Sequence, residues 1–433
     1  MTLVHRLLAR PRAIYKAYPG QFWVLIVGTF IDRVGGALIF PFFTLYLTRT
    51  FDVRMTQVGL VFALFAVSTL VGGTLGGAVT DRLGRKGMLI FGLVGSASAT
   101  LLMGLANTLG LFLVSTVLVG LLGNSGAPAQ QAMVADLLPS ERRAQGFGIL
   151  RVVANLAVAI GPVIGGLVAA RSYLLLFVCD VVASLTAAIV VFLAIRETKP
   201  QPRQGEEVET IGQTFRGYRS VLEDAVFVLF LLACILLEFV AMQMVTTLPV
   251  YLRDVHGVTE RGYGSIMSLN AAMVVLLQFP VTRWFQGHGP LAVMAVGVVL
   301  YAVGFGMYGF VSSYAFFLAA IAVVTVGEMM TAPTAQSLVT RMAPETMRGR
   351  YMAIFGFSWV IPAAAGPTLA GLLMDHVSPQ WVWFSTGVVG SVASAMFLML
   401  RRRAGEVLET TARSSRLERV PEEAREPVCV SHT

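Results

Sequence analysis

The chain has 433 residues, of which 56% are apolar and 13% are charged, about half the charged fraction of an ordinary soluble domain. This composition excludes a water-soluble globular protein. The 32 basic residues outnumber the 24 acidic ones, and in a membrane chain the placement of such an excess reports orientation rather than nucleic-acid binding. The three cysteines offer no paired framework for disulfides.

Long apolar runs divide the chain into candidate membrane spans. Because one helical span needs about 20 apolar residues, the runs bounded by charges, Gly or Pro predict twelve spans. Six of them lie near residues 22–47, 56–79, 87–106, 109–135, 145–170 and 172–196. The other six lie near residues 225–250, 262–284, 290–311, 314–340, 350–375 and 378–400.

Polar segments separate and flank two predicted six-helix bundles, at residues 22–196 and 225–400. Residues 197–224 have mixed charge and two prolines, the composition of a solvated linker. Residues 401–433 open with three arginines and show no periodicity, which predicts a disordered tail with no fold. Residues 1–21 form a basic N-terminal segment.

The distribution of Lys and Arg predicts the orientation in the membrane. The loops opposite the termini hold only Arg49, Arg54, Arg171, Arg253 and Arg261. Nearly all other basic residues lie in the terminal segments, the linker and the loops on the same side. Since basic loops stay in the cytoplasm, we expect both termini there, in a multi-pass protein of the bacterial inner-membrane type.

The two bundles are copies of each other. A shift of 205 positions pairs three prolines of the first half with three of the second, together with several Gly, Gln and Arg residues. The pairs are Pro128 with Pro333, Pro139 with Pro344, Pro162 with Pro367, Gly161 with Gly366, Gly166 with Gly371, Gln131 with Gln336 and Arg143 with Arg348. Such agreement is rare by chance, so we interpret it as a repeat. A repeat of two bundles places a shared site between the halves, near the bilayer midplane.

One connection carries a recognisable motif. The second span is followed by Gly77-Ala-Val-Thr-Asp81-Arg82-Leu-Gly84-Arg85-Lys86. This string resembles the signature of the major facilitator superfamily, and the twelve-span repeated layout resembles that family over nearly the whole chain. The resemblance implies an all-α membrane protein with two pseudo-symmetric six-helix bundles. It also implies a gating network in this loop, formed by Gly77, Asp81, Arg82, Gly84, Arg85 and Lys86.

The fifth span carries a second motif, Gly161-Pro162-Val-Ile-Gly165-Gly166. Small residues four apart let helices approach closely, and the proline lets the helix bend. Pure packing would explain this pattern. The string is also similar to the antiporter signature of the drug:proton branch of the family, which implies export in exchange for protons.

Charged residues inside the spans are the strongest functional signal, because each costs about 2.5–3.5 kcal/mol at a helix centre unless it is paired, hydrated or neutralised. They are Asp32, Arg33, Arg151, Asp180, Glu238 and Glu328. Four acids face two arginines, so at least two acids must lie in water, hold a cation or carry a proton. For Asp180 we prefer a hydrogen bond to a neighbouring helix.

Glu328, in the tenth span, resembles a glutamate that serves proton and cationic substrate in some multidrug antiporters of the superfamily. The repeat pairs Arg33 with Glu238, so these two residues are expected to approach the cavity from opposite halves and could form a bridge. We predict Asp32, Arg33, Glu238, Glu328 and Arg151 as the coupling and substrate residues.

Several other classes of function lack support in the sequence. There is no nucleotide-binding Gly-x4-Gly-Lys motif and no zinc-binding spacing of His and Cys. We therefore expect no enzyme, no metal site and no cofactor, with a proton gradient as the source of energy.

The predicted function is a secondary transporter that exports small amphipathic or cationic compounds in exchange for protons. Its expected partners are protons, a small-molecule substrate and the lipid bilayer, without nucleic acid, and we expect it to act as a monomer. A transporter of one metabolite, such as a sugar, amino acid or lipid, is an alternative. A binding or sensor protein that does not transport is an alternative from another class.

Overall fold

The computed structural model describes residues 18–198, 219–285, 287–344 and 347–417, which form helices joined by short connections. The N-terminal half consists of α2 (Gly20–Ile39), η1 (Phe40–Phe42), α3 (Phe43–Thr50), α4 (Met55–Leu83), α5 (Arg85–Gly104), α6 (Leu109–Ser125), α7 (Ala127–Leu137), α8 (Ser140–Ala169) and α9 (Tyr173–Ala194). The C-terminal half consists of α11 (Ala225–Thr246), α12 (Leu248–His256), α13 (Glu260–Phe285), α14 (Pro290–Tyr308), α15 (Tyr314–Met342), α16 (Arg348–Phe355), α17 (Phe357–His376) and α18 (Gln380–Leu417).

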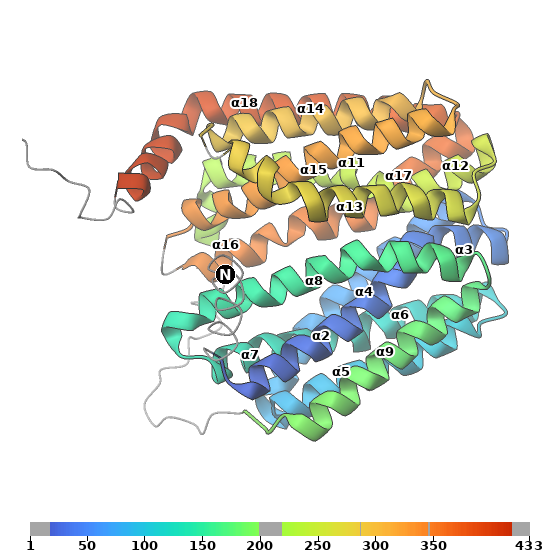
Figure 1. Cartoon of the computed structure of the whole chain (residues 1–433), viewed down its shortest axis with the longest axis vertical. Helices are drawn as coiled ribbons and strands as arrows, with labels where there is room; N and C mark the ends of the chain where they lie inside the picture. The colour runs from blue at the N-terminus through green and yellow to red at the C-terminus, as the bar shows by residue number, and fades with distance from the viewer. Residues whose placement is uncertain (1–17, 199–218, 286, 345–346, 418–433) are drawn as a thin grey trace, which may run out of the picture.

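Within these ranges twelve helical segments are long and apolar enough to cross a membrane. This number confirms the predicted spans. Figure 1 shows the two halves as two bundles of long, roughly parallel and antiparallel helices that lie against each other.

Breaks in the first and seventh spans occur at equivalent places in the repeat. The first span breaks at η1, which contains Pro41, and the seventh breaks at Thr247, two residues before Pro249. Proline interrupts the helical hydrogen-bond ladder because it has no N–H group. The short helices that follow, α3 and α12, contact each other across the two halves.

The two ends of the molecule differ. At the end that carries α3 and α12, on the right in Figure 1, one buried apolar cluster runs through both halves and includes Leu47, Met55, Tyr251 and Leu252. We call this the closed end. Toward the other end the N-terminal half has a separate apolar cluster around Phe22 and Met133. We call this second end, where α7 and α16 lie, the open end.

The predicted disordered tail is partly wrong. Helix α18 continues beyond the membrane span as far as Leu417, so residues 401–417 are helical. Residues 418–433 of the tail, 1–17 of the N-terminal segment and 199–218 of the linker lie outside the described residues, whereas residues 219–223 form a short helical turn.

Candidate functional site

A cavity of about 690 Å³ lies between the two halves. It is lined by residues of both halves and extends along the first span from Phe40 of η1, near the closed end, to Leu25 of α2, toward the open end. These 15 positions correspond to about 22 Å of helix at 1.5 Å per residue. The cavity is therefore long enough to reach from the region of the span breaks well into the open end.

Four of the residues that line the cavity are ionisable: Asp32, Arg33, Asp180 and Glu328. Three of these were predicted as cavity residues from the sequence. Three carboxyl groups face one guanidinium group, and Arg33 is exposed and makes no ion pair with the described residues. An excess of acid over base in a cavity lined mostly by apolar side chains, with some uncharged polar ones, favours a cationic ligand or protonated carboxyls.

The C-terminal wall of the cavity holds Glu328. The amide nitrogen of Asn270, on α13, donates hydrogen bonds to Glu328 Oε2 (2.8 Å) and to Thr325 Oγ1 (2.9 Å). Both amide protons of Asn270 are thus committed to α15, and its position fixes the direction of the Glu328 carboxylate. Met244 and Met267 lie nearby on the same wall.

Two of the predicted site residues lie off the cavity surface. Glu238 does not line the cavity, although its charge interacts with that of Glu328 and with Tyr301 on α14. No ion pair joins Glu238 to Arg33 in the described part of the chain, so the predicted bridge is absent from this structure. The two residues are equivalent in the repeat, yet Arg33 is directed into the cavity and Glu238 toward the interior of its own half.

Arg151 is exposed and is also absent from the cavity lining. It precedes the lining residues Val158 and Pro162 on α8 by 7 and 11 positions. Residues at these spacings share one face of a helix. Arg151 therefore lies on the same stripe as the cavity lining, nearer the open end.

The N-terminal wall holds the other two carboxyl groups. Ser184 Oγ, on α9, donates a hydrogen bond to Asp32 Oδ1 (2.8 Å). Asp180 is only 6% exposed and packs against Gly35. From the sequence we preferred a hydrogen bond between Asp180 and a neighbouring helix. In the structure Asp180 interacts with Thr100 of α5 and also lines the cavity next to Asp32. The signal that could have identified it is its position as one of only four acids inside the spans, where a charge is costly.

Aromatic side chains complete the cavity. Phe40, Phe43, Phe62 and Phe65 line it near the closed end, and Trp359 lines it from α17. Trp359 is 41% exposed, although it is one of the largest apolar side chains. Such a surface can bind lipophilic groups, and aromatic faces also attract cations.

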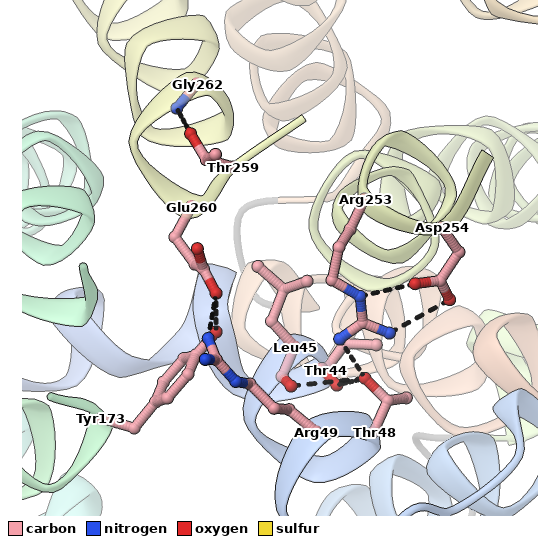
Figure 2. Close-up of polar contacts among 10 residues, drawn as sticks. All are labelled: Thr44, Leu45, Thr48, Arg49, Tyr173, Arg253, Asp254, Thr259, Glu260 and Gly262. Atoms are coloured by element: carbon pink, nitrogen blue, oxygen red, sulfur yellow. Dashed lines mark hydrogen bonds and ion pairs between the residues drawn. The ribbon is translucent and has the colours of Figure 1, made fainter. Parts of the chain in front are cut away.

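At the closed end, polar side chains join the two halves (Figure 2). Glu260 Oε1, at the start of α13, accepts hydrogen bonds from Arg49 Nη1 (2.7 Å) and from the Tyr173 hydroxyl (3.1 Å). Arg253, on α12, donates to Thr48 Oγ1 (2.9 Å) while it forms an ion pair with its neighbour Asp254. Residues 48 and 253 are equivalent in the 205-residue repeat, so this bond joins the two halves across their symmetry axis.

A second polar contact closes the same end on the other side. Asp375, in the last turn of α17, accepts hydrogen bonds from the Thr56 backbone nitrogen (2.9 Å), the Thr56 hydroxyl (2.7 Å) and the Met55 backbone nitrogen (3.3 Å). The first backbone N–H groups of a helix have no partner within the helix and carry partial positive charge. The C-terminal half thus caps α4 of the N-terminal half.

The antiporter-type motif of α8 lies at a close contact between helices. A Cβ atom on Gly161 or Gly165 would collide with α2 or η1, at Ala37, Leu38 or Phe42. A Cβ on Gly166 would lie 2.9 Å from Gly264 Cα in the other half. Pro162 lies within this stretch and lines the cavity. The structure therefore shows a packing role for these glycines, at the place where the halves meet.

The loop between the second and third spans contacts α7 and α9 of the N-terminal half. Gly84 has φ of 93°, which favours glycine, and Gly77 lies beside Pro128. Arg85 Nε forms an ion pair with Asp136 (3.2 Å), and Lys86 Nζ donates to the Phe192 carbonyl (2.7 Å). The side chains of Asp81 and Arg82 lie outside the described residues.

The start of the linker also binds this loop. Glu197 accepts hydrogen bonds from the backbone nitrogens of Arg85 (2.9 Å) and Lys86 (3.2 Å), at the N-terminus of α5. The contacts described here join this loop to α7, to α9 and to the start of the linker. In this state they hold the N-terminal half together at the open end.

The described residues contain no cluster of three or more His, Cys, Asp or Glu side chains able to hold a metal ion. The arrangement as a whole is a cavity between two halves that are joined at one end. Such an arrangement suits alternating access, in which the halves rock around a central site.

Comparison with known proteins agrees with this architecture. The family model described as the Major Facilitator Superfamily matches residues 25–269 and 254–429, and the chain belongs to this family. It is therefore a transporter and a multi-pass membrane protein, not an enzyme.

Two relatives and one solved structure indicate which members it is similar to. The chain is 28% identical over 402 residues to the Na(+), Li(+), K(+)/H(+) antiporter of Planococcus maritimus, covering 86% of this chain and 92% of the relative. It is 24% identical over 375 residues to the multidrug resistance protein MdtH of Shigella flexneri, covering 85% and 91%. A crystal structure of a POT family transporter in complex with 5-aminolevulinic acid superposes with a TM-score of 0.72 at 15% identity, covering 89% and 96%, which shows a shared fold.

Proposed function

We propose that this protein is a proton-coupled antiporter that exports small lipophilic cations from the cytoplasm across the cell membrane. The observation that carries this proposal is Glu328, a carboxylate held by Asn270 on the wall of an apolar and aromatic cavity. A proton and an organic cation would compete for this carboxylate. Competition for one acidic group couples the two movements in opposite directions.

Other features support the proposal. The excess of basic residues on the side of the termini favours a cytoplasmic location for the open end. The cavity would then receive substrate from the cytoplasm in the state seen here. We propose that the protein functions as a monomer and that a proton gradient is its source of energy.

Exchange of alkali cations for protons is a second candidate. It is favoured by the three carboxyl groups of the cavity and by the similarity to the relative named as a Na(+), Li(+), K(+)/H(+) antiporter. Oxygen ligands of this kind suit hard cations. The same cavity would take the smaller ion with its hydration water.

The proposed test uses inside-out vesicles with an imposed proton gradient. Proton release is followed on addition of lipophilic cations such as tetraphenylphosphonium, of neutral drugs, and of Na⁺, Li⁺ or K⁺. We expect release with several organic cations and its loss in Glu328→Gln. Glu223→Gln is the matched control, since Glu223 is an exposed acid paired with Arg219 far from the cavity.

Two other outcomes would change the assignment. Release with alkali cations alone would replace the organic-cation proposal by the second candidate. Absence of release with every compound, in vesicles that contain folded protein, would contradict both and would favour a single-metabolite transporter.

A further inference from the structure

We infer that Asp32 and Asp180 form a second proton-carrying centre, on the N-terminal wall of the cavity and separate from Glu328. The inference deepens the proposed function and rests on it for the direction of transport. It concerns a residue, Asp180, that the sequence favoured only as a hydrogen-bonding partner of a neighbouring helix.

The contacts between α2 and α9 place the two carboxyl groups together. The two helices run antiparallel, and Gly28 lies against Ala187, Asp32 against Ser184, and Gly35 against Asp180. These three contacts follow one another along the same pair of helices. Asp32 and Asp180 therefore lie about one turn apart on facing helices, and their charges interact.

Asp180 is fitted closely into this helix pair. A Cβ on Gly35 would lie 2.6 Å from Asp180 Oδ1 and 2.9 Å from the Ala183 side chain. Only a glycine leaves room for the carboxyl group here. Asp180 is 6% exposed, yet it contributes to the cavity surface, so its proton has a path to the cavity while its charge has little access to water.

The charges around the pair favour one bound proton. The ionisable groups that face it are Arg33 on α2 and, across the cavity, Glu328 on α15. The polar neighbours on the packed helices are Ser184 on α9, which donates to Asp32, and Thr100 on α5, which interacts with Asp180. One arginine can compensate one of the two carboxylates, and two buried like charges cannot both remain ionised without a cost of several kcal/mol.

Two centres predict a different charge balance from one. Exchange of one proton at Glu328 for one monovalent organic cation moves no net charge across the membrane. If the pair of Asp32 and Asp180 carries a second proton inward in the same cycle, each cycle moves one net positive charge into the cell. Export of a monovalent cation would then be driven by the membrane potential as well as by the pH gradient.

The first experiment detects the proton directly, without transport. Infrared difference spectroscopy of the full-length protein in lipid nanodiscs reports the C=O stretch of protonated carboxyl groups. We expect part of this C=O band to be lost in Asp180→Asn and in the double variant Asp32→Asn/Asp180→Asn. The same part of the band should remain in Glu328→Gln and in the exposed control Glu223→Gln. Unchanged intensity in the double variant would overturn the inference, whatever substrate the protein carries.

The second experiment measures the charge balance. Proteoliposomes are loaded with tetraphenylphosphonium, and its exchange is measured under an imposed membrane potential with no pH gradient. Because this cation also crosses lipid unaided, the flux of protein-free liposomes under the same potential is subtracted, and only the protein-dependent flux is compared. The wild type is expected to respond to the potential, whereas Asp180→Asn loses this response but keeps exchange driven by a pH gradient through Glu328. Equal responses of wild type and Asp180→Asn would contradict the second centre.

Folding and substrate are controlled separately. Asp180→Ser fits the same space without a titratable group, so it replaces Asp180→Asn if the latter fails to fold, as judged by size-exclusion chromatography. If the wild type exchanges none of the tested cations, the proposed function fails, and the infrared comparison still decides whether the pair holds a proton.

Discussion

The two halves meet at the closed end along two seams that the 205-residue repeat relates to each other. In one seam α4 packs on α17, and in the other α13 packs on α8. Gly166 of α8 and Gly371 of α17 are equivalent in the repeat, and both lie where the backbones of the two halves come close. The repeat therefore preserves the backbone geometry of the two seams.

The polar chemistry of the two seams differs. In the α8–α13 seam, Glu260 lies at the start of its own helix and accepts hydrogen bonds from the side chains of Arg49 and Tyr173 in the other half. In the α4–α17 seam, Asp375 of the C-terminal half accepts hydrogen bonds from backbone N–H groups of α4 in the N-terminal half. Both seams place one carboxylate at a helix N-terminus. One contact depends on side chains, among them the exposed Arg49, and the other depends mainly on fixed backbone groups. We expect unequal contributions to the closure of this end.

The largest effect is expected from removing the feature that the seams share. Gly166→Leu and Gly371→Leu would force side chains into backbone contacts, and overpacking costs about 1–3 kcal/mol. We expect either variant to lose transport about tenfold or more and to leave the closed end open. The measurement is the initial rate of transport, together with the labelling of a single cysteine placed at this end.

Gly306→Leu is the matched control for these two glycines. It lies in α14, where a Cβ meets no atom within 4 Å. Normal closure in Gly166→Leu and Gly371→Leu, with labelling equal to that of Gly306→Leu, would show that the backbone contacts do not hold the two seams.

The second largest effect is expected in the α4–α17 seam and tests the difference between the two seams. Asp375→Ala removes the cap on α4, and loss of an N-terminal cap costs about 0.5–2 kcal/mol. We expect the closed end to open in a larger fraction of molecules, measured by electron–electron spin distances between labels on α3 and α12. Asp52→Asn is the control, because it removes an acid from an exposed loop at the same end. Equal distance distributions in the two variants would remove Asp375 from the closure.

A smaller effect is expected in the other seam. Arg49 is 63% exposed, and exposed ion pairs contribute about 0.2–1 kcal/mol. Glu260→Gln should therefore open the closed end less than Asp375→Ala does, and its effect should shrink at high salt, which screens exposed charges. The same spin distances, recorded at low and high ionic strength, test this. A larger shift in Glu260→Gln than in Asp375→Ala would reverse the proposed ranking of the seams.

The sequence was sufficient for the parts of this architecture that depend on local patterns. Apolar runs of span length predicted all twelve helices because each must bury its backbone in lipid. The repeat predicted that Gly166 and Gly371 are equivalent, and the structure places both at seams between the halves. The helical continuation of residues 401–417 was missed because their mixed charge gives no apolar stripe.

The long-range pairs could not be predicted in the same way. Arg33 and Glu238 are equivalent in the repeat, but side chains rotate by about 100° per residue around a helix, so equivalence does not bring them to one surface. Glu260 and Asp375 lie at the ends of two predicted spans, 262–284 and 350–375, and nothing in the sequence singled them out. Their partners depend on which end of the molecule is closed, and this is set by tertiary packing.

The smallest effect is expected at the bond that crosses the symmetry axis. Thr48→Val removes the hydroxyl that accepts from Arg253, but Arg253 keeps its ion pair with Asp254, and water can replace the lost acceptor. Because water can replace the acceptor, we expect a change in the closure at the low end of the range for a hydrogen bond, about 0.5 kcal/mol, seen as spin distances close to those of the wild type. A change as large as that of Asp375→Ala would show that the contact between α3 and α12, rather than the two seams, decides whether this end is closed.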